Sequence, residues 1–525
     1  MTPVGSVSAH RTSTAAIPGE GSRVGRNIAA LAGSQIVTWT LSLGWNVFVP
    51  RALGPHGMGE LTIATAVAGV LSVFASLGIG TLMVREIARD HARAPQLVGT
   101  ALLTRALIVP PVLGAVGVYV LLGHWSTEQV VVLWLATTAM LLTFFIQPFQ
   151  SAFQGIERMQ YLAYSDIISK TVLSVVGIAL VIIGFRVVGI MWLTVLTTVL
   201  ALLLCAWWSR SKFSVDLTFD LRSIGVLVLA ALPFWSMGLA HTVYTWIDSL
   251  MLSVMAPDVV VGWYAVPTKI FNTIGFSAIL ISTAMLPRFS AAVREGADAL
   301  RSAVKPALEL VLVLSLPITV GTALLAHQFI DAIYGRQFEP SIGVLQIMVF
   351  MLPAVSFSVL ANQVLIANNR QLAWTKVTIA AAIINPLLNL ILIPLFQSRT
   401  GNGAIGAAIS LLATEVGMAV AGLYLLPPIL DASSVSRLLR AVAATGGMAL
   451  AVWMSTGMGA LVAVAVGGIV FATLAIAFKL FTVEERAILR RITLRLFWND
   501  SGRYSTTKYR GWDDISARPI GKFGR

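Results

Sequence analysis

Residues 187–208, VVGIMWLTVLTTVLALLLCAWW, form an apolar run that contains no charged side chain. A helix rises about 1.5 Å per residue, so about 20 such residues cross the roughly 30 Å hydrocarbon core of a bilayer. Similar runs recur along almost the whole chain, without the alternation of apolar and polar residues that is typical of membrane β-barrels. The sequence therefore predicts an all-α polytopic membrane protein.

The composition agrees with a membrane location. Of the 525 residues, 57% are hydrophobic and 11% are charged, whereas a soluble domain carries about 25% charged residues. The only cysteine, Cys205, lies inside an apolar run, so one chain has neither a disulfide framework nor a thiolate metal site, and a packing role is expected. The net charge of +13 could indicate a nucleic-acid partner, but the basic residues lie at span ends, where they favour a membrane surface.

Charged and turn-forming breaks divide the chain into about fourteen predicted spans. These spans cover residues 27–49, 58–83, 97–122, 129–152, 166–184, 187–208, 224–255, 259–286, 304–326, 341–366, 373–396, 403–426, 437–456 and 458–480.

The distribution of basic residues predicts the orientation. An even number of spans places both chain ends on one side, where the loops carry fourteen Lys and Arg residues; the opposite loops carry only Arg51, Arg186, Arg336 and Arg399. Because cytoplasmic loops are enriched in basic residues, we expect both termini to be cytoplasmic, with the protein in the cytoplasmic (inner) membrane.

The two chain ends differ in character from the spans. Residues 1–26 are polar and basic and lack the short apolar core of a signal peptide, so we expect a cytoplasmic N-terminal arm. Residues 482–525 form a basic tail that begins TVEERAILRRITLRLF, a pattern typical of an amphipathic helix on the inner leaflet.

Two short segments indicate an internal repeat. Asn46 precedes Pro55 by nine residues, and Asp248 precedes Pro257 by nine residues; in each case a glycine follows near the start of the next span. The repeat is offset by six spans, which predicts two bundles related by a pseudo-twofold axis along the membrane normal. The predicted units are residues 27–208 (helices 1–6), residues 224–426 (helices 7–12) and an appended pair, helices 13 and 14, at residues 437–480.

Eight stretches in a consistent order resemble the polysaccharide-biosynthesis (Wzx-type) flippases of the multidrug/oligosaccharidyl-lipid/polysaccharide (MOP) superfamily, over roughly residues 25–480. They are RALGPHGMGEL (51–61), SLGIGTLMVREIAR (76–89), FQGIERMQYLAYSDIISK (153–170), YTWIDSLMLSV (244–254), GWYAVPTKI (262–270), MLPRFS (285–290), LNLILIP (388–394) and GAIGAAIS (403–410).

The resemblance implies two bundles around a central cavity and the movement of a polyprenyl-diphosphate-linked oligosaccharide from the inner to the outer leaflet. It further implies that Lys269 occupies a position that is often basic or polar in the family's eighth helix, and that Asp248 occupies a recurrent acidic position in the seventh. The partners that it implies are the lipid-linked oligosaccharide and the bilayer, with a polysaccharide polymerase and other biosynthesis proteins as candidates.

Four charged residues lie inside predicted spans without an obvious local partner: Arg105, Asp248, Lys269 and Glu415. A charge at the bilayer centre costs about 2.5–3.5 kcal/mol, so each one needs a structural or functional reason. In contrast, Lys305 and Glu309 are four residues apart and can form a local pair. For Asp248 and Lys269 we keep two hypotheses: an ion pair between helices 7 and 8, or a polar cavity wall.

The cavity hypothesis assigns a role to each candidate side chain. Lys269 and Arg105 would bind the diphosphate, and Asn46 and Asn272 would bind sugar hydroxyls. Asp248 and Glu415 would exchange a coupling ion, H⁺ or Na⁺. The tryptophans, among them Trp45, Trp235 and Trp246, are expected mainly to anchor helices at the membrane interfaces, with stacking of one or two of them against sugar rings as the alternative.

The sequence argues against an enzyme. It contains no HExxH or GxxxxGK[ST] motif and no large extramembrane loop, so no metal centre, cofactor or nucleotide site is expected and an ion gradient is the energy source. Two alternatives within the superfamily stay open: a flippase for lipid II, the peptidoglycan precursor, and an ion-coupled multidrug antiporter.

Overall fold

The computed structural model of the chain describes residues 20–123, 125–218, 220–426 and 429–481. The side chains of residues 20–39 and of several residues between 233 and 284 lie outside this description. So do the predicted C-terminal tail, residues 482–525, and most of the predicted N-terminal arm. Within the described ranges every element of secondary structure is a helix, which confirms the all-α prediction.

The helices form two groups and a final pair. The first group comprises α1 (Glu20–Ser76), α2 (Ile79–Arg89), η1 (His91–Arg93), α3 (Ala94–Leu122), α4 (Thr127–Gly155), α5 (Gln160–Ile183) and α6 (Val187–Arg210). The second comprises α7 (Leu221–Met255), α8 (Asp258–Glu295), α9 (Ala297–Leu324), α10 (Ala326–Tyr334), η2 (Arg336–Phe338), α11 (Ser341–Val349), α12 (Leu352–Ala367), α13 (Gln371–Thr400) and α14 (Gly403–Leu425). The final pair is α15 (Ala432–Ser455) and α16 (Ala460–Ala477), joined by η3 (Thr456–Met458).

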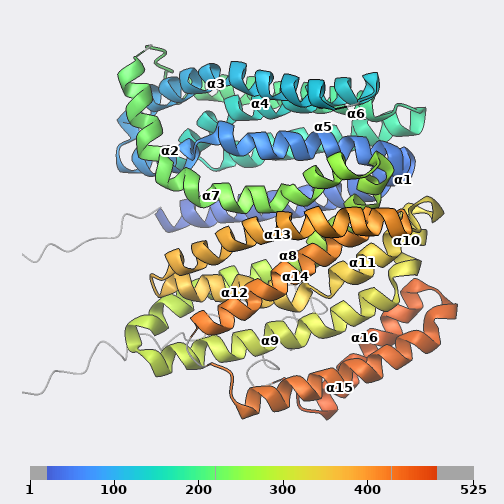
Figure 1. Cartoon of the computed structure of the whole chain (residues 1–525). Coiled ribbons are helices and arrows are strands. Elements are labelled where there is room, and N and C mark those ends of the chain that lie inside the picture. Colours follow the sequence, from blue (N-terminus) through green and yellow to red (C-terminus); the bar gives the residue numbers. More distant parts are fainter. Residues whose placement is uncertain (1–19, 124, 219, 427–428, 482–525) are drawn as a thin grey trace, which may run out of the picture.

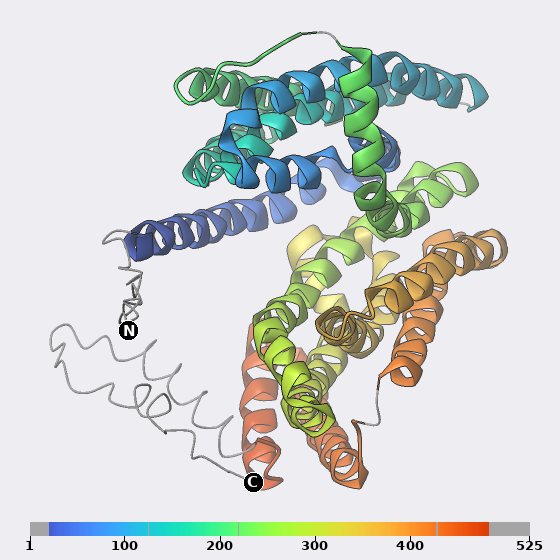
Figure 2. The ribbon, with the colours of Figure 1, turned by 90° about the vertical axis from the view of Figure 1, so that its left-hand side faces the viewer.

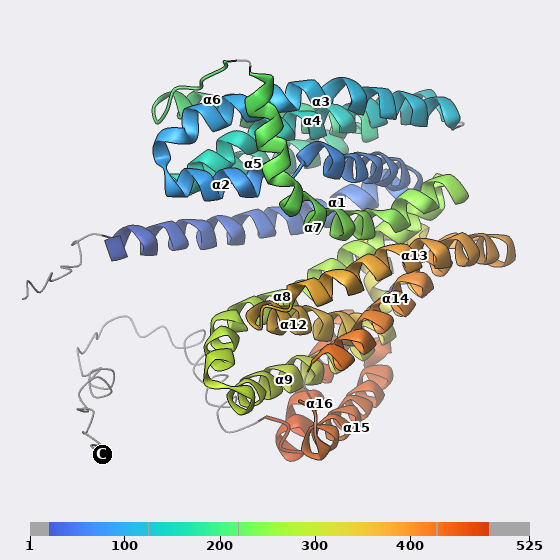
Figure 3. The same ribbon diagram turned by 60° about the vertical axis from the view of Figure 1, so that its left-hand side comes forward.

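The two groups lie one above the other in Figure 1, with α2–α6 in the upper part and α8–α14 in the lower part. α1 and α7 run along the boundary between them, and α7 reaches this boundary from the upper side (Figures 2 and 3). α15 and α16 lie at the lower edge, where α15 packs against α9. The fold can thus be described as two groups of helices and a final pair, whereas the predicted domain bounds and the pseudo-twofold axis stay predictions.

Three predicted spans differ in detail from the observed helices. The span 27–49 and most of the span 58–83 share one helical run, α1, which bends at Gly54, where φ is 70°; glycine adopts this left-handed value without a steric penalty. The span 58–83 also runs across a break, because α1 ends at Ser76 and α2 begins at Ile79. The helix begins at Glu20, before the predicted start at residue 27. The prediction began late because hydropathy marks only the apolar part of a helix and not its polar extension. The span 341–366 is divided into α11 and α12, which are bent by 43°.

The number of membrane crossings is a separate question. Ten helices in the described part of the chain are long and apolar enough to cross a bilayer, and α11 with α12 would make an eleventh. The predicted ranges 224–255 and 259–286 fall on α7 and α8 and are helical throughout. The count of fourteen spans stays a prediction.

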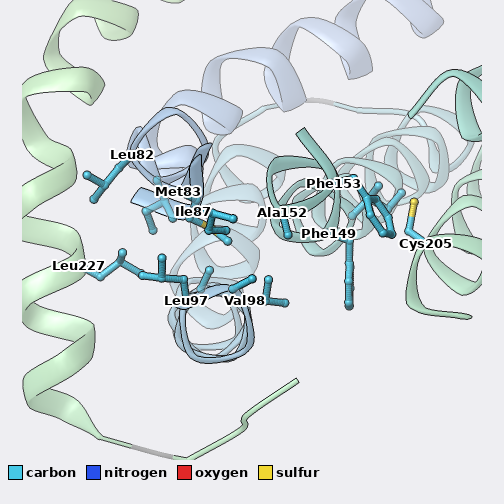
Figure 4. Packing of buried hydrophobic residues seen from close by; sticks show 14 of the residues in the cluster. Leu82, Met83, Ile87, Leu97, Val98, Phe149, Ala152, Phe153, Cys205 and Leu227 are labelled. Carbon is cyan, nitrogen blue, oxygen red and sulfur yellow. The ribbon is translucent and has the colours of Figure 1, made fainter. Parts of the chain in front are cut away.

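A buried apolar cluster holds the first group together. It joins side chains from α2, α3, α4 and α6, and Leu227 of α7 closes one side of it (Figure 4). Cys205 of α6 is fully buried at the opposite side, near Phe153, and its sulfur lies 3.7 Å from Ser165 Oγ. This environment agrees with the packing role expected for the only cysteine.

A chain of charged contacts attaches the final helix pair to the second group. Arg437 of α15 donates to Glu309 of α9 over 2.7 Å, and both side chains are buried. Lys305 lies 4.0 Å from Glu309, which is the predicted local ion pair, and 2.6 Å from Asp431, so a shorter contact between elements adds to the local one. The Lys305 ammonium, through its hydrogen bond, is the main cause that holds the pKa of Asp431 below its usual range.

The substitution Glu309→Gln is expected to loosen the attachment of α15. It would leave the Arg437 guanidinium buried without a carboxylate, a change that costs about 3–5 kcal/mol in comparable buried pairs. Thermal unfolding of the purified protein should show a clearly lowered transition. Arg440→Gln, at an exposed arginine of the same helix, should change it little; equal effects of the two substitutions would contradict this reading.

Candidate cavity and ion-coupling site

The two groups touch most closely where α1 bends and α8 begins. A Cβ atom added at Gly59 of α1 would overlap the carbonyl oxygen of Asp258, and one added at Gly262 of α8 would overlap the carbonyl oxygen of Pro55. Each glycine therefore lets the backbone of the opposite helix approach, in a reciprocal arrangement. We call this contact the glycine seal.

Further hydrogen bonds close the same end of the molecule. The Arg51 guanidinium donates to the Ala332 carbonyl over 3.0 Å, and the Gln337 amide donates to the Arg51 carbonyl over 2.8 Å. Gln129 of α4 donates to Asp258 over 2.9 Å. All three bonds join the first group to the second, so this end is shut by both packing and polar contacts.

A cavity of about 1510 Å³ lies between the groups below the glycine seal. Its walls come from α1, α2, α4, α5 and α6 on one side and from α7 and α8 on the other. It extends from Met58, next to the seal, to Arg85 of α2, whose side chain is 46% exposed. The cavity is thus closed at the end with the seal and reaches solvent toward the opposite end.

The charged side chains among the residues that line this cavity are both cationic: Arg85 and Lys269. Arg85 is paired with Glu86 at 3.0 Å. The Lys269 ammonium lies 4.0 Å from the Met58 sulfur, and no described carboxylate comes within ion-pair distance of it. Asn272, one turn further along α8, is exposed to the same cavity. The wall therefore offers an amine without a counter-charge beside an amide.

Asp248 lies in a buried polar cluster outside this cavity. Its Oδ2 accepts a hydrogen bond from the Tyr264 hydroxyl of α8 at 2.9 Å, and its Oδ1 accepts one from Asn389 of α13 at 2.6 Å. Asn389 also donates to Asn385 at 3.1 Å. The Asn389 oxygen has no hydrogen-bond partner among the residues that the structure describes. Carboxylate, amide and phenol oxygens thus meet in one place, and oxygen ligands suit hard cations.

Glu415 of α14 is the second buried carboxylate on this side of the molecule. It is 9% exposed and accepts a hydrogen bond from the Tyr244 hydroxyl over 2.8 Å. Tyr244 lies one turn before Asp248 on α7. One turn of this helix therefore binds Glu415 and the next turn carries Asp248, the two carboxylates predicted as ion-coupling residues.

Of the two hypotheses for Asp248 and Lys269, the ion pair is absent from this structure, because the two Asp248 oxygens accept hydrogen bonds from Tyr264 and Asn389. Asp248 contacts Tyr264, which lies five residues before Lys269 on α8, and five residues correspond to a rotation of about 140° around a helix. The two positions therefore face different sides of α8: Tyr264 faces the buried cluster and Lys269 faces the cavity. The ion-pair hypothesis rested on the similar depth of Asp248 and Lys269 in the membrane, and depth alone does not show which face of a helix a residue occupies.

The remaining predicted site residues do not reach the cavity wall. Arg105 is 2% exposed, donates to Gln147 at 3.1 Å and stacks over Phe144 at 5.5 Å. Gln147 and Phe144 line the cavity, so Arg105 lies directly behind them. Asn46 is partly buried on α1, where the adjacent Trp45 takes the lining position.

Sequence reasoning missed several side chains in both places. Trp45, Trp235 and Trp246, expected as interface anchors, line the cavity. This location agrees with the alternative role in stacking against sugar rings, and position along a span does not reveal which face of the helix points inward. A signal did exist for Asn385 and Asn389: they are polar residues four positions apart in an apolar span, and so share one helix face.

The chain is similar in sequence to known protein families. The sequence profile described as "Polysaccharide biosynthesis protein" matches residues 24–293, and the profile MatE matches residues 233–391. A Shigella dysenteriae protein described as a candidate O-antigen transporter is 29% identical over 209 residues, which are 39% of this chain and 50% of the relative. The chain thus matches about half the length of that relative.

Two solved structures share the fold. The lipid II flippase MurJ, in an inward closed conformation, aligns with a TM-score of 0.69 over 86% of this chain and 98% of its own, at 13% identity. An inward-facing multidrug resistance transporter of the MATE family and MOP superfamily aligns with a TM-score of 0.60 over 79% and 99%, at 17% identity.

Exchanging the two charges tests the observed separation of Asp248 from Lys269. The double variant Asp248→Lys with Lys269→Asp would place an ammonium between Tyr264 and Asn389, with no carboxylate to replace the one removed. We expect a melting temperature well below that of either wild type or Asp248→Asn, since an uncompensated buried charge costs several kcal/mol. Wild-type stability of the exchanged protein would restore the ion-pair hypothesis.

Proposed function

This chain belongs to the polysaccharide biosynthesis protein family, and on that premise we propose that it moves a polyprenyl-diphosphate-linked oligosaccharide from the inner to the outer leaflet. The family match covers residues 24–293, and the fold is that of transporters of the MOP superfamily. It is therefore a multi-pass membrane transporter of the Wzx type. The substrate, the direction of transport and the ion are the parts that we propose.

The observation that carries the proposal is the charge of the cavity. Its described lining has two cationic side chains and no carboxylate, and Lys269 faces the space without a counter-ion. Removing a diphosphate from water is costly unless cations compensate it, and a lysine supplies a mobile point charge. The cavity thus suits the anionic head-group of a lipid-linked sugar better than a neutral or cationic solute.

The rest of the lining suits a sugar chain. Hydroxyl and amide side chains from α1, α4 and α7 line the space, and Asn272 lies one turn from Lys269. Trp45, Trp235 and Trp246 add broad apolar rings, on which the faces of pyranose rings can pack. The volume of about 1510 Å³ exceeds the roughly 300–1,000 Å³ of pockets for drug-sized ligands. An oligosaccharide head-group is of the size that such a cavity accommodates.

Arg105 would act on the substrate indirectly. Its guanidinium supports Gln147 from behind the cavity wall, and its charge adds to the positive potential of the wall. The predicted direct contact of Arg105 with the diphosphate would require Gln147 and Phe144 to move aside. Asn46 would need a similar rearrangement, because Trp45 takes the lining position next to it.

The buried cluster around Asp248 is the proposed coupling site. A proton would neutralise the carboxylate, whereas Na⁺ would be held by the oxygens of Asp248, Asn385, Asn389 and Tyr264. Tyr264 and Lys269 lie on different faces of the same helix, α8, so movement of that helix would change the ion site and the substrate wall together. Glu415, bound to Tyr244, would be a second acidic group on the same path.

One specific observation favours the alternative of a lipid II flippase. The lipid II flippase MurJ aligns over 98% of its own length, and lipid II also carries a diphosphate, so the charge of the cavity suits both substrates. A multidrug antiporter of cationic drugs is disfavoured, because the described lining would repel them.

The proposal has further parts. We place the protein in the cytoplasmic membrane with both termini inside, in contact with a polysaccharide polymerase.

Lys269→Ala tests the role of the cavity amine. A charge-assisted hydrogen bond contributes about 1.5–3 kcal/mol, so the apparent affinity for a polyprenyl-diphosphate-linked oligosaccharide should fall roughly 10- to 100-fold. The measurement is leaflet exchange of a defined substrate in proteoliposomes, with lipid II as the competing substrate. Lys376→Ala, at an exposed lysine of α13, should exchange as wild type does. Unchanged affinity in Lys269→Ala would remove the amine from substrate binding.

Asp248→Asn tests the coupling site. The amide keeps the shape of the side chain and can still bond Tyr264, so the protein should fold, but it can neither take up a proton nor bind Na⁺ through a charge. In proteoliposomes with an imposed H⁺ or Na⁺ gradient, wild type should speed up and the variant should not. A variant that responds to the gradient as strongly as wild type would exclude Asp248 as the coupling residue.

A further inference from the structure

A histidine and two carboxylates meet at the sealed end, away from the cavity and from the Asp248 cluster. His56 Nδ1 lies 2.8 Å from Asp258 Oδ2, and His56 Nε2 lies 3.5 Å from Glu60 Oε1. One potential ligand atom from each of the three residues lies within 4.8 Å of the others. His56 and Glu60 are four residues apart on α1 and so share a helix face. Asp258 begins α8, so the cluster joins the two groups of helices.

Glu60 is the unusual member of this cluster. Its side chain is only 3% exposed, and its nearest cationic atom, His56 Nε2, lies at 3.5 Å. It receives no hydrogen bond from any residue that the structure describes. A buried carboxylate normally has strong partners because its desolvation is costly. Apart from this contact with His56, the Glu60 carboxylate faces a small cavity and is available to a ligand from outside the chain.

The surroundings leave an excess of negative charge and an adjacent space. A cavity of about 250 Å³ is lined by His56, Glu60, Glu128 and Arg186, together with neighbouring apolar groups. Even with a protonated His56, the three carboxylates of Glu60, Glu128 and Asp258 outnumber the two cations, His56 and Arg186. A divalent cation would balance this charge, and the partly exposed His56, at 56%, gives it a route from solvent.

We propose that His56, Glu60 and Asp258 bind a divalent transition-metal ion, with Zn²⁺ as the best match. One imidazole nitrogen and two carboxylate oxygens are ligands that Zn²⁺ takes at about 2.0–2.2 Å, and water would complete a tetrahedral set. The two nitrogens of His56 face different carboxylates, so the ion would replace one of these two contacts. Gln129, which donates to Asp258, would orient that carboxylate from outside the ligand set. Because the ligands come from both groups of helices, the bound ion holds the glycine seal closed.

This inference is independent of the proposed substrate. It follows from the geometry at the sealed end, which the distribution of basic residues predicts to lie at the outer surface. Its consequence is regulatory: zinc at that surface favours the state with the outer end shut and slows any transport cycle that must open it.

The test uses the full-length protein, prepared without a polyhistidine tag and placed in lipid nanodiscs. Calorimetric titration with ZnCl₂ should show one site per chain, and zinc should raise the melting temperature, because an ion that binds only the folded state stabilises it. Glu60→Gln and Asp258→Asn should each weaken the affinity by about tenfold or more, since even outer-shell changes cost 10–100-fold. In each variant, the zinc affinity and the zinc-induced rise in melting temperature should decrease together.

His327→Ala is the matched control, because it removes an exposed histidine of α10, near the same end of the molecule, and should leave both responses unchanged. If Glu60→Gln does not fold, Asp258→Asn decides the test, since Asp258 is the less buried carboxylate. Wild-type zinc affinity in the variants, or no zinc binding by the wild type, would overturn the proposal.

Discussion

The reciprocal contact of α1 and α8 at Gly59 and Gly262 is the constraint on which the rest of the arrangement depends. Two helix backbones can approach this closely only where neither carries a Cβ. The contact closes one end of the molecule and leaves the cavity below it open toward the other end. Lys269 lies seven residues, about two turns, after Gly262, so the helix face that forms the seal also presents the amine to the cavity.

α8 separates two polar environments that the proposed transport cycle must connect. On one face Lys269 meets the cavity, and on another Tyr264 is bound to Asp248. A rigid helix that carries both residues transmits a change at either one to the other. This gives a physical route for coupling that does not require a direct bond between the carboxylate and the amine. The proposed mechanism therefore does not depend on an ion pair between Asp248 and Lys269.

Much of the fold could be predicted because burial in a membrane leaves a strong signal along the chain. Long apolar runs marked the helices, and the equal spacing of Asn46 from Pro55 and of Asp248 from Pro257 indicated two similar halves. Gly59 and Gly262 follow the two prolines of that repeat by four and five residues, so both halves place a glycine early in the next helical segment. The predicted start of the first helix was late, since polar residues can extend a helix beyond its apolar part.

The candidate site was less predictable, because its contacts join residues that are far apart in the sequence. Nothing near Asp248 identifies Asn389, and nothing near His56 identifies Asp258, about 200 residues further along the chain. Helix rotation was the second obstacle: it decides that Lys269 and Trp246 face the cavity while Arg105 lies behind Gln147. Both kinds of information arise only when the helices pack.

The most direct test of the account is to hold the sealed end shut during transport. Arg51→Cys and Ala332→Cys, in a Cys205→Ser background, place thiols on the two sides of an observed contact between the groups. A short reducible cross-linker should stop leaflet exchange of the lipid-linked oligosaccharide in proteoliposomes, and reduction should restore it. Exchange at the uncross-linked rate in fully cross-linked protein would contradict the claim that the substrate leaves through this end.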